Sequence, residues 1–207
     1  SEYKNDQEEV LKKISKLSYP VIVKPATTGS SIGISVAEDE AKVKEAIDDA
    51  INYDTKIIVE EVVKNLKEVN ISVLGNYEHQ KLSVIEEVVG KNKFLTYEDK
   101  YIGGGKAKGK LGAKGVPCVK GSKGMLSATR KIPAELPDKI QKEVENVAIK
   151  AFKALGSAGC CRIDFLIDEK GKKVYVNEIN SIPGSLAFYL WEPLNKDYTD
   201  LLEDMIN

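Results

Sequence analysis

The strongest constraint on the fold is the stretch RIDFLIDEKGKKVYVNEIN, residues 162–180, in which polar and apolar side chains alternate on both sides of a glycine. Successive side chains of a β-strand point to opposite faces of a sheet, so this alternation predicts two strands joined as a hairpin. The turn is expected near Gly171. Ile163, Phe165 and Ile167 would then pack into a core, which leaves the other face to polar groups.

The polar face of this hairpin is expected to gather several charged groups. With the turn near Gly171, Asp164 falls opposite Glu178 and Arg162 falls opposite Asn180. Cross-strand neighbours lie about 5 Å apart, and two carboxylates at that distance repel each other unless a cation lies between them. An oxygen-only ligand set suits Mg²⁺, which takes the rest of its shell from water and substrate phosphates. The neighbouring arginine could stabilise a developing anion.

The same alternation admits a simpler interpretation, a solvated polar face with a surface Arg–Glu ion pair. Asn180, which precedes the sequence Ser-Ile-Pro-Gly, could also belong to an ordinary turn. Strict alternation along the second strand puts Val176 on the face of Glu178 and Tyr175 on the opposite face. The choice between a surface hairpin and a metal site therefore depends on the rest of the chain.

Composition narrows the class of protein. The chain has 207 residues, 42% hydrophobic and 30% charged, with a net charge of -1, which suits one large globular domain or two small ones. No apolar run approaches the roughly 20 residues of a membrane span, and the polar start is no secretory signal, so we expect a cytoplasmic protein without a membrane partner. Cys118, Cys160 and Cys161 form no paired framework. The adjacent pair should point to opposite faces of a strand as buried thiols.

The periodicity of apolar residues predicts a mixture of helices and antiparallel strands. This mixture indicates an α+β fold and argues against a doubly wound parallel sheet. Leu155 is expected on the buried stripe of its helix, with Gly156 in the left-handed position past the helix end. The expected helices span residues 6–17, 37–53, 136–155 and 198–206, and further strands span residues 19–25, 55–63, 67–76 and 81–90.

Two segments outside the hairpin carry groups suited to phosphate. VIVKPATTGSSIG ends an apolar strand with Lys24 and continues into a Gly/Ser loop, residues 29–33, which can offer N–H and hydroxyl groups to phosphate oxygens. It is not a Walker A loop, and a simple hairpin turn is the alternative. Lys100 precedes residues 103–124, a glycine- and lysine-rich stretch without acidic residues, which we expect to be a loop. Without interleaved aromatic residues, that stretch is a poor nucleic-acid arm, so no nucleic-acid partner is expected.

A third segment, IIVEEVVKNLKEVNI, carries acceptors suited to a nucleoside. Glu60 and Glu61 end a buried strand, and Glu68 follows a short connection later. Their carboxylates could accept hydrogen bonds from an adenine amino group and from ribose hydroxyls. Alone, this pattern has little specificity.

In this order the segments resemble the ATP-grasp ligases, and within them the D-alanine–D-alanine ligases. The most specific parts are PVIVKPATTGSSIG, FLTYEDKY, KAFKALG with CRIDF, and VNEINSIPG. The resemblance implies an ATP-grasp fold, in which two α+β subdomains with mixed or antiparallel sheets grip ATP between them. The smaller subdomain would be residues 1–60, incomplete at its N-terminus, and the larger one residues 61–207, with residues 103–124 as a flexible lid.

The resemblance also implies roles for individual residues. Lys24 and Lys100 would contact phosphates, the serine loop would close over the γ-phosphate, and Glu68 would hold the ribose. The implied ATP-binding residues are Lys24, Ser30, Ser31, Glu60, Glu61, Val63, Glu68 and Lys100. The implied catalytic residues are Arg162 and Ser31. The implied ligands of two Mg²⁺ ions, or of Mn²⁺ in their place, are Asp164, Glu178 and Asn180.

The implied reaction makes a dipeptide for peptidoglycan precursors. A D-alanine carboxylate attacks the γ-phosphate of ATP, and the amine of a second D-alanine attacks the acyl phosphate. Because acyl phosphates hydrolyse, a closing loop must exclude water. The full-length protein would be a homodimer, and an N-terminal substrate domain of the family would precede this chain. For the chain alone, ATP binding is then expected and full turnover is not. Tyr189 stands where a serine for the second substrate's carboxylate is expected. Two alternatives therefore stay open: a carboxylate–amine ligase with a different amino acid, and a non-catalytic ATP-binding module.

Overall fold

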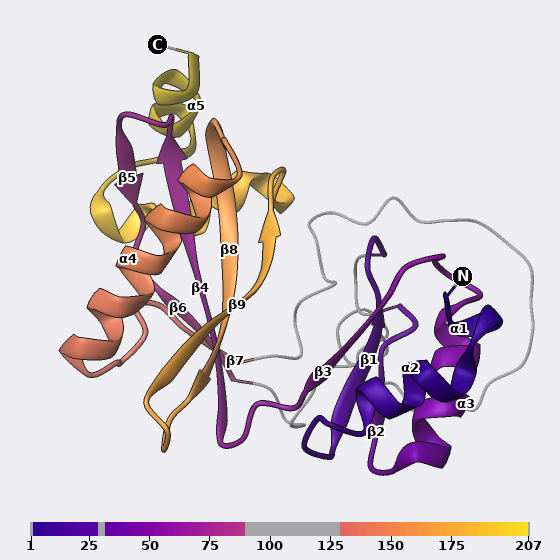
Figure 1. Ribbon diagram of the computed structural model, residues 1–207. Helices are drawn as coiled ribbons and strands as arrows, with labels where there is room; N and C mark the ends of the chain where they lie inside the picture. The colour runs from indigo at the N-terminus through magenta and orange to yellow at the C-terminus, as the bar shows by residue number, and fades with distance from the viewer. Residues whose placement is uncertain (1, 29–31, 90–128, 207) are drawn as a thin grey trace, which may run out of the picture. The chain divides into compact units, whose positions relative to one another are not determined.

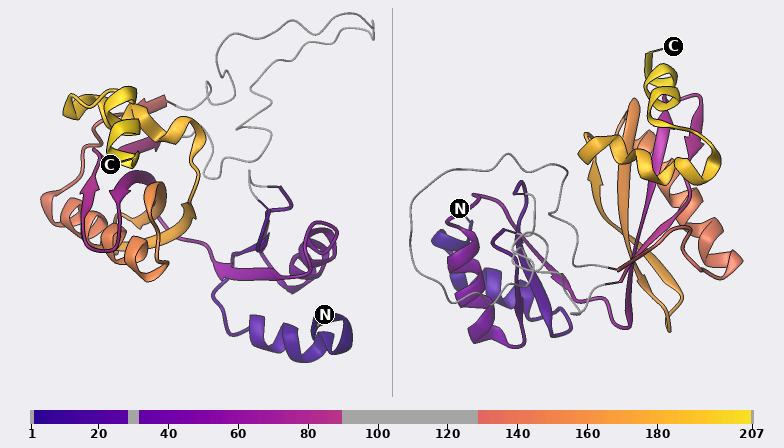
Figure 2. Two further views of the ribbon diagram at one scale, coloured as in Figure 1. Left: turned by 90° about the horizontal axis from the view of Figure 1, so that it is seen from above. Right: turned by 180° about the vertical axis from the view of Figure 1, so that it is seen from behind.

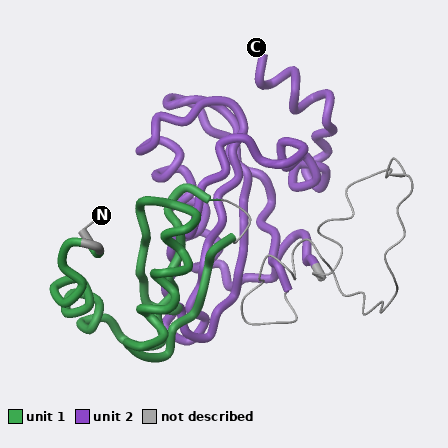
Figure 3. The backbone as a smooth tube through the Cα atoms, turned by 90° about the vertical axis from the view of Figure 1, so that its right-hand side faces the viewer, with its two compact units in different colours: residues 1–62, 91–127 green, residues 63–90, 128–207 purple. Residues whose placement is uncertain are grey.

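The structure is a computed structural model that describes residues 2–28, 32–89 and 129–206, and these fall into two compact units (Figure 1 and Figure 3). The described residues of the first unit end at Val62, and the second unit holds residues 63–89 and 129–206. Each unit combines helices with an antiparallel sheet, so the α+β class predicted from the sequence is confirmed. No helix in the described part of the chain is long and apolar enough to cross a membrane.

The first unit is a three-stranded sheet covered on one face by helices. The strand order is β2-β1-β3, and both pairings are antiparallel. Asp6 and Asp39 cap two helices by accepting backbone N–H groups of Glu9 and Lys42. The strands are β1 (Val21–Pro25), β2 (Ser35–Ala37) and β3 (Ile57–Glu61), and the helices are α1 (Glu2–Asn5), α2 (Gln7–Ile14) and α3 (Glu40–Ala50).

The helices of the first unit pack on the face of β1 that carries Val21 and Val23. Both valines are fully buried against Leu11 of α2 and Val43 of α3. Because strand side chains alternate, Lys24 projects to the opposite face of β1. The sheet therefore separates an apolar helix-covered face from a second face that carries the predicted nucleotide-binding lysine.

The second unit is built on a six-stranded sheet. The strand order is β7-β6-β4-β8-β9, and β5 pairs with β4. All pairings are antiparallel, and the longest runs the full length of β4 and β8. The strands are β4 (Leu66–Gly75), β5 (Gln80–Leu82), β6 (Glu86–Val89), β7 (Thr129–Lys131), β8 (Gly159–Asp168) and β9 (Lys173–Asn180).

One face of this sheet is closed by the long helix α4 (Asp138–Ala154), as two of the views show (Figure 1 and Figure 2). Phe152 and Val144 of α4 are fully buried against Ile71 of β4 and Ile163 of β8. Burial of such side chains stabilises the unit by about 1.5–3 kcal/mol each. Leu155 is 64% exposed, so its predicted burial is wrong. The helix ends at Ala154, and the next residue has left its packed stripe.

The other face of the sheet is covered only at one end. There, the 3₁₀ segments η2 (Gly184–Leu190) and η3 (Glu192–Leu194) and helix α5 (Tyr198–Ile206) follow β9. Trp191 and Leu201 bury the apolar side chains of Leu74 and Cys160. Trp191 therefore anchors the C-terminal segment on the sheet. The remainder of this face carries polar side chains, and it positions the site.

Candidate active site

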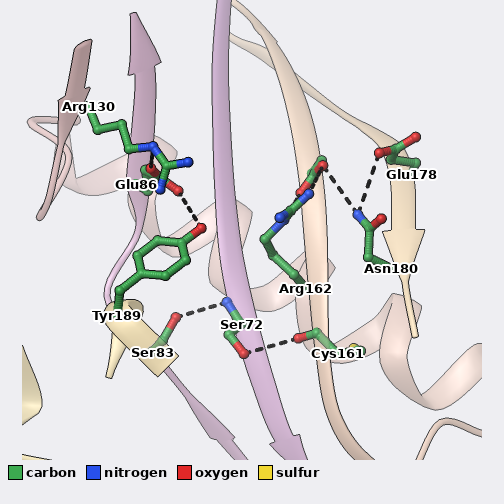
Figure 4. Close-up of polar contacts among 10 residues, drawn as sticks. Ser72, Ser83, Glu86, Arg130, Cys161, Arg162, Glu178, Asn180 and Tyr189 are labelled. Atoms are coloured by element: carbon green, nitrogen blue, oxygen red, sulfur yellow. Dashed lines mark hydrogen bonds and ion pairs between the residues drawn. The ribbon is translucent and has the colours of Figure 1, made fainter. Parts of the chain in front are cut away.

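The hairpin that the sequence predicts is formed by β8 and β9, in the predicted register. Arg162 pairs with Asn180, and Asp164 pairs with Glu178. The core side chains of β8 lie on the face covered by α4, so the charged set lies on the opposite face of the sheet. Figure 4 shows Arg162, Glu178 and Asn180 projecting from these two neighbouring strands.

A β-bulge changes the alternation just beyond the charged set. Asp164 pairs with Glu178, but the next residue, Phe165, pairs with Val176, so Asn177 is an extra residue in β9. Cross-strand partners share a face, which puts Val176 on the core side with Phe165. The predicted side of Val176, with Glu178, is therefore wrong. Because one residue is inserted, the residues of β9 before the bulge face the side opposite to the one that strict alternation predicts. A two-residue period in the sequence cannot reveal such an insertion.

Arg162 and Asp164 form a two-pronged ion pair within β8. Arg162 Nε lies 2.7 Å from Asp164 Oδ1, and an Nη nitrogen lies 2.8 Å from Oδ2. The two side chains are 15% and 22% exposed, so solvent screens the pair only partly. Burial lowers the pKa of Arg162, but the hydrogen bond and charge of Asp164 outweigh it and raise that pKa above its ordinary value. The arginine is therefore fixed in place as a permanent cation.

The side chains of the three predicted metal ligands lie next to one another, joined by hydrogen bonds from the Asn180 amide. Asn180 Nδ2 lies 3.3 Å from Asp164 Oδ2 and 3.5 Å from Glu178 Oε1. The amide group of Asn180 thus donates to both carboxylates, and Figure 4 shows its contact with Glu178. The two carboxylates offer the hard oxygen ligands that Mg²⁺ prefers, and Asn180 would have to turn its Oδ1 towards the ion to join them. Within the described residues no three His, Cys, Asp or Glu side chains gather as a metal cluster, so such a site would rely on Asn180 and on ligand oxygens.

The site extends across the sheet through two residues that the sequence analysis missed. Asn70 of β4 pairs with Asp164 on one side and with Glu86 of β6 on the other. Glu86, Asn70, Asp164 and Glu178 therefore form a polar row across four strands on one face of the sheet. The alternation of polar and apolar residues in KEVNISVL predicts a polar face for β4. Which strands lie beside β4, however, depends on the strand order of the sheet, and a local sequence pattern does not give that order.

Glu86 anchors the far end of the polar row. Its side chain is 1% exposed, Arg130 Nε lies 3.2 Å from Oε1, and the Tyr189 hydroxyl donates to Oε2 over 3.1 Å. The Arg130 guanidinium lies 5.1 Å from the centre of the Tyr189 ring, within cation–π range. Burial, followed by the charge of Glu86, raises the pKa of Tyr189, so this phenol stays protonated. Figure 4 shows these three side chains meeting beside β4.

In the first unit, the structure brings together two of the predicted nucleotide-binding residues. Lys24 Nζ lies 2.5 Å from Glu60 Oε1, and the lysine is 18% exposed. Ile22 pairs with Glu60 across β1 and β3, so lysine and glutamate share the face that the helices leave uncovered. Glu61 points the other way and accepts the backbone N–H of Ser18 over 2.8 Å. That contact gives Glu61 a local structural role.

The remaining predicted residues are distributed between the described and undescribed parts of the chain. Glu68 lies on β4, two residues before Asn70 and on the same face of the sheet. Val63 is the half-buried first residue of the second unit. Ser30, Ser31, Lys100 and the expected lid at residues 103–124 lie outside the described residues.

Comparison with known proteins identifies the family. A family model described as "D-ala D-ala ligase C-terminus" matches residues 1–116 and 120–207. The chain belongs to this family. The D-alanine–D-alanine ligase of Acetivibrio thermocellus is 39% identical over 207 residues, which cover 98% of this chain and 49% of that protein. That of Clostridium acetobutylicum is 37% identical over 210 residues, with coverage of 99% and 54%.

Solved structures agree with the family. The superposition with the VanG D-Ala:D-Ser ligase of Enterococcus faecalis covers 97% of this chain and 52% of the VanG chain, with a TM-score of 0.74 and 26% sequence identity. The superposition with the D-alanine–D-alanine ligase of Coxiella burnetii covers 97% of this chain and 47% of that protein's chain, with a TM-score of 0.70 and 25% sequence identity. The fold is therefore that of the ATP-grasp ligases, as predicted. The chain spans about half the length of the curated relatives it matches.

Proposed function

We propose that this chain is the ATP-binding catalytic portion of a D-alanine–D-alanine ligase, which forms a dipeptide for peptidoglycan precursors through an acyl phosphate. One observation carries the proposal. In a member of this family, the side chains of Asp164, Glu178 and Asn180 lie next to one another, beside a partly buried, permanently charged Arg162. A solvated polar face would have no need of this arrangement.

The chemistry requires one anion to approach another, since a carboxylate attacks a triphosphate. Mg²⁺ bound by Asp164, Glu178 and Asn180 would supply the positive charge that neutralises this approach. Arg162 spends only part of its donor capacity on Asp164, because a guanidinium has more N–H groups than one carboxylate can use. Its remaining N–H groups would stabilise the oxyanion that forms when an amine attacks the acyl phosphate.

Lys24 and Glu60 would bind the nucleotide. In the absence of ATP each neutralises the other, so neither is left as an uncompensated charge on a partly buried surface. On binding, Lys24 would transfer to an α-phosphate oxygen, and Glu60 would be released to accept the adenine amino group. Glu68 would hold the ribose, while Ser30, Ser31 and Lys100 would contact the phosphates.

A second candidate function is favoured by Tyr189. Its hydroxyl already donates to Glu86, so it has no proton left to offer a substrate carboxylate. This second candidate is a ligase selective for an amino acid other than D-alanine as the second substrate. ATP supply and the free, buried Cys160 and Cys161 support a cytoplasmic location for either enzyme. Assembly of the full-length protein as a homodimer stays a prediction.

The test is substrate-dependent phosphate release by the full-length protein. With Mg²⁺, ATP and D-alanine, phosphate and D-alanyl-D-alanine should appear in equal amounts, and omission of Mg²⁺ or of D-alanine should stop both. Faster release with a different amino acid would select the second candidate. Tight ATP binding without phosphate release for any amino acid would instead identify a non-catalytic nucleotide-binding module.

A further inference from the structure

Two buried acceptors in the polar row receive no hydrogen bond from the part of the chain that the structure describes. Asn70 is 6% exposed and Glu86 is 1% exposed, and they face each other across β4 and β6. Among the residues that the structure describes, neither Asn70 Oδ1 nor Glu86 Oε1 has a hydrogen-bond partner. Arg130 Nε lies 3.2 Å from Glu86 Oε1, but this ion pair does not have hydrogen-bond geometry.

Such atoms indicate a missing donor, because buried polar groups in folded proteins are nearly always paired. The two acceptors come from adjacent strands, so a group with several donors is needed to reach both. The Tyr189 oxygen is a third available acceptor there, since its only proton is directed to Glu86. A primary ammonium or amine carries several N–H donors, whereas a hydroxyl carries one. The chemistry therefore favours an amino group over a hydroxyl.

The position of this acceptor pair relates it to the proposed reaction. Asn70 is the direct cross-strand neighbour of Asp164, so its side chain lies about 5 Å from that residue's. Arg162 is close enough to Tyr189 for its positive charge to lower the pKa of that phenol, against the larger effects of burial and of Glu86, which raise it. A group bound by Asn70 and Glu86 would thus lie next to the cation that is to stabilise the oxyanion.

We propose that Asn70 and Glu86 form the subsite for the amino group of the second, attacking amino acid, and that they are specificity-determining residues for an amine over a hydroxy acid. This inference rests on the proposed function. It assigns to Asn70 and Glu86 the orientation of the attacking nitrogen, and it concerns binding rather than proton transfer.

The test compares binding of D-alanine with binding of D-lactate, in which a hydroxyl replaces the amino group. Calorimetry on the full-length protein with Mg²⁺ and a non-hydrolysable ATP analogue needs no turnover. The wild type should prefer D-alanine by about tenfold or more, the effect of one hydrogen bond to a charged group. Asn70→Leu and Glu86→Gln should reduce this preference to about twofold or less. Asn70→Thr, which keeps an oxygen acceptor, should retain part of it.

A matched control is available on the same strand. Glu87 neighbours Glu86 but pairs with Val69, on the opposite face of the sheet. Glu87→Gln should leave the preference for D-alanine unchanged. An equal preference in the wild type, Asn70→Leu and Glu86→Gln would overturn the inference, even if D-alanine-dependent phosphate release had established the ligase. If Asn70→Leu does not fold, Glu86→Gln decides the outcome.

In the full-length enzyme the same variants should raise the KM for D-alanine about tenfold or more and change the KM for ATP less than about twofold. A residue with a purely structural role would not separate the two constants in this way. Absence of any turnover in the wild type would refute the proposed function alone, and the calorimetric comparison would still test the amino-group subsite.

Discussion

Arg162 illustrates how a single side chain can serve both the fold and the proposed chemistry. Its fork of N–H groups matches both oxygens of Asp164, a geometry that a lysine ammonium cannot reproduce. The pair holds the arginine at a fixed angle while the carboxylate remains oriented towards Asn180. A preorganised cation of this kind requires no rearrangement when charge develops in the reaction.

Replacement of this arginine should affect turnover more than nucleotide binding. Arg162→Ala removes the proposed oxyanion donor, so kcat of the full-length enzyme should fall by the equivalent of about 2.7–4 kcal/mol. The KM for ATP should change little, since the nucleotide is held by other residues. Arg162→Lys keeps the charge without the fork and should recover only part of the rate. Steady-state kinetics checks this, and an unchanged kcat in Arg162→Ala would remove the residue from the chemistry.

At the scale of elements, the segment after β9 has a strained backbone. Ser185, Leu186 and Ala187 have φ values of 50°, 54° and 52°, in the left-handed region, which costs about 1–2 kcal/mol for each residue other than glycine. Ala187 and Leu190 are fully buried, and this packing holds the strained turn in place. The turn leads directly into Tyr189. Strain of this kind is common where a loop must deliver a side chain to a site.

The exposed first residue of this turn provides a stability test. Ser185→Gly relieves the left-handed strain but adds freedom to the unfolded chain, so the free energy of unfolding should rise by about 0.5–1 kcal/mol. The same change in a strand, Ser35→Gly in β2, should lower it by about 0.5–1 kcal/mol. Urea denaturation of both variants measures the difference. A less stable Ser185→Gly protein would mean that the serine side chain itself supports the turn.

Asp54 also acts at the scale of elements, because its hydrogen bonds connect the loop after β1 to the start of β3. It accepts the N–H of Lys56 over 3.0 Å and both the N–H and the hydroxyl of Thr27 over 2.7 Å. These hydrogen bonds, led by that of Lys56 and then the Thr27 hydroxyl, lower the pKa of Asp54 from 3.8 to about 2. They favour the ionised carboxylate in the folded state.

The depressed pKa fixes the direction of the pH dependence. The folded-state value lies below the unfolded one, so Asp54 stabilises the fold above about pH 4 and loses this effect as the pH falls towards 2. The unfolding free energies of wild type and Asp54→Asn should therefore converge as the pH is lowered through this window. Asp49→Asn on the exposed face of α3 should keep the wild-type pH dependence. A constant gap between wild type and Asp54→Asn would contradict the assignment.

At the scale of the whole molecule, the features of the fold that the sequence predicts correctly are those that depend on a local sequence pattern. The hairpin register followed from its turn near Gly171, and the last helix was predicted at its observed bounds, residues 198–206. Gly156 takes the expected left-handed conformation, with φ +59°. Cys160 and Cys161 are buried in different clusters, as expected for opposite faces of a strand.

The parts that the sequence did not predict depend on non-local pairing. The bulge at Asn177 inserts one residue without changing the alternation of residue types around it. The roles of Asn70 and Glu86 arise because β4 lies between β6 and β8, strands far apart in the sequence. Tyr189 could be recognised as a departure from the family, but its contact with a buried glutamate could not be foreseen. Register within a hairpin is local information, whereas strand order is not.

The central claim is that Asp164, Glu178 and Asn180 bind the divalent cation that accompanies ATP. Glu178→Gln tests it most directly, because the side chain is exposed and the change preserves its shape. A non-hydrolysable ATP analogue would be titrated calorimetrically into full-length wild type and variant, with and without Mg²⁺. We predict that Mg²⁺ strengthens binding to the wild type and has no such effect on Glu178→Gln, with equal melting temperatures. Equal strengthening by Mg²⁺ in both proteins would contradict the account.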